Sequence, residues 1–164
     1  MTEGTALAES SDLLELRHEA GEAPRRYVGR FTCKGLVTVG GAVEEAGRFE
    51  VGIWFPDEYL RSVEPTQIVT WLSPPNILHP NIRPPLICLG HLWPGSPLVD
   101  ILYQTFEVIT CKKVTMDERD ALNPSACVWA RQHQDRFPVD PRPLKRRRVR
   151  LNVAAESSAQ ETSS

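Results

Sequence analysis

The sequence lacks long hydrophobic runs. No segment of its 164 residues reaches the roughly 18 consecutive apolar residues that a membrane-spanning helix needs. Its first residues, MTEGTALAESSD, lack the basic start and apolar stretch of a signal peptide. We therefore expect a cytoplasmic protein with no membrane partner.

Cysteine is also scarce, with four residues in the chain. They form no CxxC pair and are too few for a disulfide framework. Cys88 and His91 make half of a zinc-type set, but no second pair follows at the required spacing, so we expect no metal and no other cofactor. Cys33, Cys111 and Cys127 fall on apolar faces and are expected in the core. Cys88 is therefore the candidate for a reactive thiol.

Net charge is small, at a formal value of -2. A chain built mainly to neutralise phosphates would carry a large positive excess, so we do not expect nucleic acid as the main partner. The charge is nevertheless segregated, because residues 1–24 are acidic and residues 142–150 are basic. The basic segment leaves four alternatives open: nucleic acid, an acidic partner, the acidic N-terminal helix, or a solvated tail.

The first half of the chain is predicted to contain one helix followed by strands. Asp12 and Glu15 have the spacing of a capping box, which favours a helix over 11–21. Apolar and polar residues then alternate over 27–39 and 49–55, and 67–72 is rich in β-forming residues. Short turns between these segments predict an antiparallel meander.

The second half is predicted to be a long loop followed by two helices. Prolines and glycines fill 73–95, after which Ser96-Pro97 and Asn123-Pro124 each offer a cap followed by proline. The second helix is expected to run until Pro138. This order gives an α+β fold: N-terminal helix, antiparallel meander, long loop, two C-terminal helices. The last residues, small and polar, are predicted to be disordered.

The long loop is where chemistry is expected. Cys88 lies among prolines, which would hold a thiol in place at little entropic cost. Asn81 lies seven residues earlier, and its amide could donate to an oxyanion formed at that sulfur. The alternative is structural: a small buried cysteine and a turn-forming asparagine.

Several motifs, in order, resemble those of ubiquitin-conjugating enzymes. His79-Pro80-Asn81, then Ile87-Cys88-Leu89, then Trp93-Pro94 is similar to the active-site stretch of that family. The segment 48–59, RFEVGIWFPDEY, and the segment 119–124, RDALNP, resemble two other parts of it. The resemblance covers roughly 10–138 and implies a ubiquitin-conjugating-enzyme-like catalytic domain there, followed by a basic segment and tail over 139–164.

The resemblance implies an activity and roles for four residues. Cys88 would carry a ubiquitin-like modifier as a thioester, received from an activating enzyme and passed to an amine of a protein substrate. Asn81 would orient the loop and stabilise the oxyanion, and His79 would hold that loop. Asp120 would position and deprotonate the incoming lysine. His91 as a base near the thiol is a further alternative.

The match also has departures. The spacing from Asn81 to Cys88 is one residue shorter than usual, the loop from Cys88 to Trp93 is shorter by a few, and 73–78 is longer. Divergence and the arginine-rich balance favour a bacterial member, and bacterial conjugation systems include some that act against phage. A catalytically silent adaptor of the same fold is the rival hypothesis, although such adaptors generally lack the cysteine.

Overall fold

A six-stranded antiparallel sheet forms the centre of the computed structural model, which describes residues 3–21 and 23–145. Its strands lie in the order β1 (Leu14–His18), β2 (Arg26–Phe31), β5 (Phe49–Trp54), β6 (Val69–Ser73), β8 (Leu86–Ile87) and β7 (Ile82–Arg83). A separate hairpin pairs β3 (Gly35–Val39) with β4 (Ala42–Ala46). The helices are α1 (Glu3–Glu9), α2 (Pro65–Ile68), α3 (Leu98–Ile109) and α4 (Pro124–Gln132), with 3-10 turns at Asp57–Leu60 and Gln134–Arg136. The fold is therefore α+β, as the sequence predicts.

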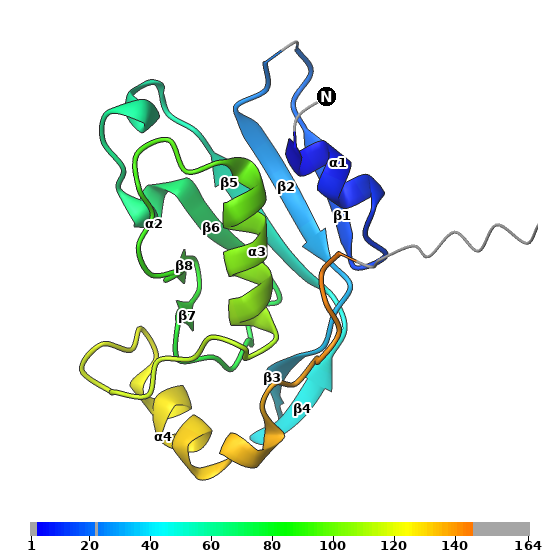
Figure 1. The fold of residues 1–164 in the computed structure, drawn as a ribbon. Helices are drawn as coiled ribbons and strands as arrows, with labels where there is room; N and C mark the ends of the chain where they lie inside the picture. The colour runs from blue at the N-terminus through cyan, green and yellow to red at the C-terminus, as the bar shows by residue number, and fades with distance from the viewer. Residues whose placement is uncertain (1–2, 22, 146–164) are drawn as a thin grey trace, which may run out of the picture.

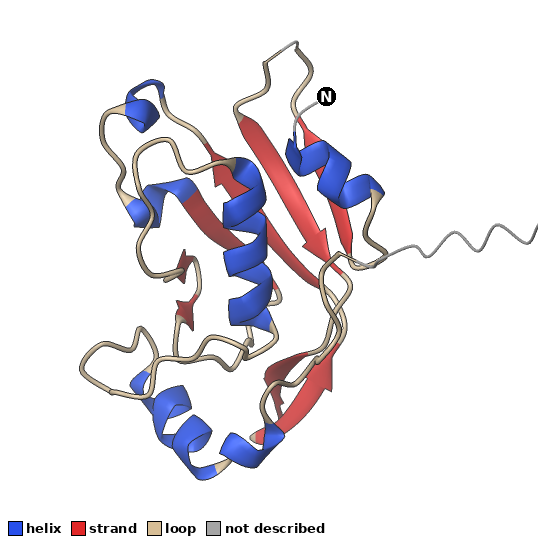
Figure 2. Cartoon of the chain, in the orientation of Figure 1, coloured by secondary structure: helices blue, strands red, loops and turns tan. Residues whose placement is uncertain are grey.

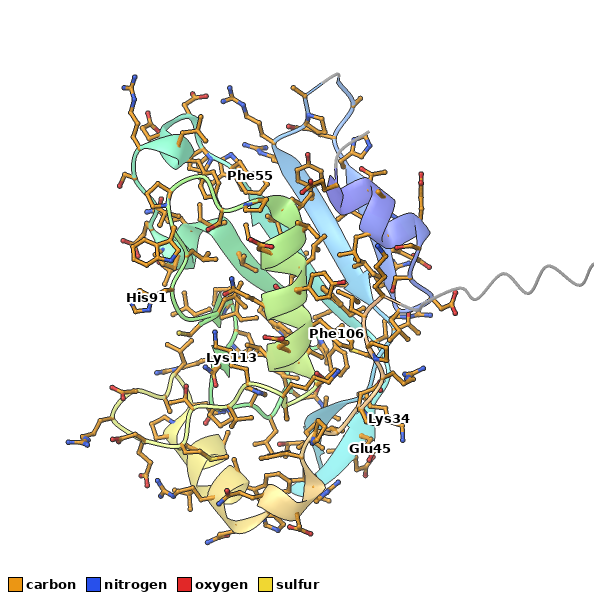
Figure 3. All side chains as sticks on the ribbon, viewed as in Figure 1. Lys34, Glu45, Phe55, His91, Phe106 and Lys113 are labelled. Carbon is orange, nitrogen blue, oxygen red and sulfur yellow. The ribbon has the colours of Figure 1, made fainter. Side chains whose placement is uncertain are left out.

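Helix α3 lies across one face of the sheet, and α1 packs beside it (Figure 1). Its sequence predicts this placement, because apolar residues recur at helical spacing and almost all of them are buried in the structure. Phe106, labelled in Figure 3, stacks on Phe31 of β2 with ring centroids 6.5 Å apart. This contact ties the helix to the middle of the sheet.

The predicted helix over 11–21 is wrong. The segment contains strand β1, and the helix lies earlier, at α1. Leu14 pairs with Phe31 and is buried, Glu15 is exposed, and Leu16 is again half-buried. This alternation has the period of a strand, and pairing with Tyr27–Phe31 of β2 outweighs the capping-box spacing that suggested a helix.

The predicted strand over 27–39 is two strands. β2 ends at Phe31, and β3 begins at Gly35 and pairs with β4 instead of the main sheet. Gly35 lies where the chain leaves the main sheet for the hairpin, and it passes close to its neighbours there. A Cβ on Gly35 would lie 2.6 Å from the Phe49 ring and 3.0 Å from the Ile109 carbonyl. The other two predicted strands are confirmed as β5 and β6. The predicted long loop is also present between β6 and α3, where the short strands β7 and β8 interrupt it (Figure 2).

Helix α4 begins as predicted, because the Asn123 side chain accepts from the Ala126 N–H and Pro124 takes the first helical position. It ends sooner, at Gln132, where a 3-10 turn follows in place of the continued helix expected up to Pro138.

The chain after Pro138 packs back onto the domain. Leu144 is buried in the same core as Leu7 of α1, so the packed residues extend past both ends of the predicted domain, 10–138. The Asp140 carboxylate is also buried, and it accepts from the Lys34 N–H and the Arg142 guanidinium. The Arg142 hydrogen bond holds the pKa of Asp140 well below its usual range. Of the predicted basic segment and disordered tail, 146–164 lies outside the described residues.

None of the helices within 3–21 and 23–145 is long and apolar enough to cross a membrane.

Candidate functional site

The β7–β8 hairpin brings Asn81 and Cys88 together. Ile82 pairs with Ile87, so the residues just outside this pair lie opposite each other. The Cys88 N–H donates to the Asn81 carbonyl at 2.8 Å. The seven-residue spacing seen in the sequence is therefore the length of a tight hairpin, which fixes the backbone on both sides of the candidate site.

Cys88 differs from the other cysteines in its exposure. It is half-buried, whereas Cys33, Cys111 and Cys127 are 1%, 4% and 0% exposed. Burial raises the pKa of both Cys33 and Cys111 to about 12, which keeps them as thiols at neutral pH. The prediction that these three cysteines belong to the core is confirmed, and Cys88 is the one thiol that a reagent or a protein partner can reach.

Asn81 is nearly fully buried, and its side-chain amide is held on both sides. Its Oδ1 accepts from the Thr115 N–H at 2.9 Å, and its Nδ2 donates to the Thr115 hydroxyl at 2.8 Å. A second, longer bond runs from Nδ2 to the Cys88 carbonyl at 3.3 Å. The two bonds to Thr115 fix the orientation of the amide, and the bond to Cys88 is the one most easily exchanged for another acceptor.

His79 supports this loop from beneath. Its ring is 1% exposed, and Nδ1 accepts from the Asn81 N–H at 3.0 Å, so the proton of the neutral ring lies on Nε2. Among the described residues Nε2 has no hydrogen-bond partner of normal geometry. Burial lowers the pKa of His79 to about 3, and the Val108 backbone opposes that shift only in part. A ring with this pKa stays neutral at physiological pH and does not become an imidazolium there.

This burial predicts an acid-sensitive fold. Because the pKa of His79 is about 3 when folded and near its ordinary 6.5 when unfolded, the unfolded chain alone binds a proton between these values. Stability is therefore fully present above pH 6.5 and falls as the pH drops toward 3, by about 2 kcal/mol at pH 5. Urea unfolding at pH 7.5 and pH 5.0 measures this difference.

The His79→Gln variant is the control for that measurement, since an amide oxygen can still accept from the Asn81 N–H but does not titrate. We expect its overall stability to be lower and its loss between pH 7.5 and pH 5.0 to be smaller than the loss of the wild type. Equal losses in the two proteins would show that His79 does not carry the acid sensitivity.

Asp120 lies on a neighbouring loop. It is exposed, and within the described part of the chain its carboxylate makes no hydrogen bond or ion pair. The Asn123 N–H donates to the Pro80 carbonyl at 3.0 Å, which attaches this loop to the one carrying His79 and Asn81. The structure thus joins His79, Asn81 and Cys88 by direct hydrogen bonds, and within the described residues no hydrogen bond joins Asp120 to Cys88.

His91 is also exposed, and its ring contacts Trp93 with centroids 6.0 Å apart. No hydrogen bond joins its ring to Cys88 in residues 3–21 and 23–145. The same part of the chain holds no group of three or more histidine, cysteine or acidic residues that could bind a metal ion.

Two residues at the site have no counterpart in the sequence predictions. Thr115 holds the Asn81 amide, and the Lys113 ammonium donates to the carbonyl of Leu89, the residue after Cys88. Both lie on the segment after α3, more than twenty residues from their partners in sequence. No motif or spacing marks them, because the contacts depend on how α3 returns the chain to the loop.

Comparison of the chain with protein-family models gave no match, and comparison with curated proteins gave none either.

Proposed function

We propose that the protein is a conjugating enzyme that carries a ubiquitin-like modifier on Cys88 and transfers it to an amine of a protein substrate. The observation that carries this proposal is one accessible thiol on a rigid hairpin, directly beside a buried amide donor. The resemblance of the HPN, ICL and WP motifs to those of ubiquitin-conjugating enzymes supports it, as does the α+β architecture.

The chemistry needs a nucleophile that is also a good leaving group. In loading, the Cys88 sulfur attacks the thioester that joins the modifier to the activating enzyme, and the activating enzyme's thiol leaves. In transfer, an amine attacks the Cys88 thioester, the C–S bond breaks, a C–N bond forms, and the Cys88 thiol is released. Both steps pass through a tetrahedral oxyanion, which a positioned N–H donor stabilises.

In this proposal Asn81 supplies that donor. The Nδ2 hydrogen that makes the long bond to the Cys88 carbonyl can be given to the oxyanion instead, while the two bonds to Thr115 keep the amide in its orientation. His79 keeps the Asn81 backbone in place as a neutral hydrogen-bond acceptor. Asp120, exposed on the adjacent loop, is proposed to receive the substrate lysine as it approaches the thioester.

The test is loading of the full-length protein. With ATP, a cognate activating enzyme and its modifier, we expect an adduct that dithiothreitol removes and that protects Cys88 from iodoacetamide, as read by mass spectrometry of peptides. The three buried cysteines serve as internal controls, because their alkylation in the native protein should be low and unchanged by loading. A cognate pair that binds the protein without forming an adduct would favour the silent adaptor and overturn the enzyme.

A further inference from the structure

Lys113 is held against the loop that carries Cys88. Its backbone N–H donates to the Glu107 carbonyl at 3.0 Å in the turn that ends α3, which fixes the position from which the side chain extends. From there the side chain reaches the loop, where Nζ donates to the Leu89 carbonyl. Figure 3 shows Lys113 near the lower end of α3. The amine is therefore hydrogen-bonded to Leu89, the residue immediately after the Cys88 that would carry the thioester.

Gly90 makes room for this amine. Its φ is +91°, in the region that favours glycine, and a Cβ built on it would lie 2.7 Å from Lys113 Nζ. Any other residue at this position would push the ammonium away from the loop. The backbone after Cys88 and the lysine thus fit one another closely, and the amine is held at the residues that directly follow Cys88 without needing a partner protein to bring it there.

The other three lysines of the chain lie elsewhere. Lys34 pairs with Glu45 at 3.1 Å on the β3–β4 side of the molecule, well separated from Lys113 in Figure 3. Lys112 Nζ donates to the Arg142 carbonyl at 2.6 Å and lies over the Phe106 ring, and Lys145 lies at the groove between α1 and α3. No acidic side chain within the described ranges pairs with Lys113.

We propose that Lys113 is an acceptor for the modifier carried on Cys88, so that the protein conjugates itself in cis; this inference rests on the proposed function. The Lys113 amine, after losing a proton to solvent, attacks the thioester carbonyl. The C–S bond breaks, an isopeptide C–N bond forms, and the Cys88 thiol takes up a proton. An amine already held on the same loop as the thioester avoids the entropic cost of bringing in a second molecule. The product is a stable self-conjugate.

The experiment follows the loaded protein after the activating enzyme is stopped by removing ATP, with no substrate added. We expect the thiol-sensitive adduct to convert into a thiol-resistant one whose isopeptide bond maps to Lys113 by mass spectrometry. The rate constant should not change with protein concentration, as an intramolecular step requires. In Lys113→Arg the thioester should still form but the resistant product should be lost, because a guanidinium keeps the charge and a donor for Leu89 and is not a nucleophile at neutral pH.

Lys112→Arg is the matched control, since it removes the neighbouring lysine and should leave the resistant product unchanged. A thioester that forms normally but yields no resistant product would overturn the self-conjugation and leave the conjugating activity standing. A product that persists in Lys113→Arg would overturn Lys113 as the acceptor, and a rate constant that rises with protein concentration would overturn transfer in cis. Absence of any thioester would overturn both proposals.

Discussion

Replacing Cys88 with serine is expected to give an adduct that dithiothreitol no longer removes and that is no longer passed to an amine. Serine keeps the size and position of the side chain but forms an oxygen ester, and an alkoxide is a far poorer leaving group than a thiolate. Loading should be slow, because the hydroxyl is also a weaker nucleophile. We expect transfer to added lysine to be undetectable over a period in which the wild type discharges completely.

The measurement is a gel assay with and without dithiothreitol, followed by hydroxide, which cleaves an ester but not an isopeptide bond. Cys127→Ser is the matched control, because Cys127 is fully buried and a serine hydroxyl can replace its sulfur as donor to the Thr115 carbonyl. That variant should load and discharge as the wild type does. A thiol-sensitive adduct in Cys88→Ser would mean that another cysteine carries the modifier.

The parts of the fold that the sequence predicts are those decided by local chemistry. Helix α3 follows from apolar spacing and the start of α4 from a cap before proline, and neither prediction depends on distant residues. The predicted Ser96 cap of α3 is wrong, because α3 begins at Leu98 after Pro97, and the Ser96 hydroxyl accepts from the Trp93 N–H instead. The N-terminal segment shows the opposite case. Asp12 and Glu15 fit a helix cap, but pairing with β2 decides that 14–18 is a strand, and that pairing is invisible in the segment itself.

The residues of the candidate site also divide into those that the sequence predicts and those that it does not. Asn81 and Cys88 could be found from the sequence because one hairpin carries both, and their separation along the chain is short. The distant residues that contact this loop could not be found. Thr115 reaches Asn81 across thirty-four residues, and Lys113 reaches Leu89 across twenty-four, through the turn after α3. Three-dimensional contacts of this kind leave no periodicity and no motif in a single sequence.

Asn81→Ala is expected to load normally and to discharge to free lysine about a hundredfold more slowly. Removing one oxyanion donor typically costs on the order of 3 kcal/mol of transition-state stabilisation. Loading should be less affected, since the activating enzyme contributes its own groups to that step. The measurement is single-turnover discharge of the loaded protein at several lysine concentrations, which separates the rate constant at saturation from the binding of the amine.

A slow Asn81→Ala variant alone would not distinguish an oxyanion donor from a residue that only tethers the loop, because the side chain also bonds Thr115. Asn81→Asp separates the two roles. Its carboxylate can still accept from the Thr115 N–H and hydroxyl, but it has no N–H to give and its charge opposes an oxyanion. We expect Asn81→Asp to discharge at least as slowly as Asn81→Ala.

Thr115→Val completes the comparison, since it removes the hydroxyl that Nδ2 bonds and leaves the backbone N–H of Thr115 in place for Oδ1. Discharge should then slow only a few-fold, because the Asn81 donor is still present and only its orientation is less restricted. If instead Asn81→Asp discharges at the wild-type rate while Thr115→Val is as slow as Asn81→Ala, the amide acts by holding the loop to Thr115, and the oxyanion donor must be another group. Thermal unfolding of each variant shows whether a slow rate reflects a damaged fold or a lost donor.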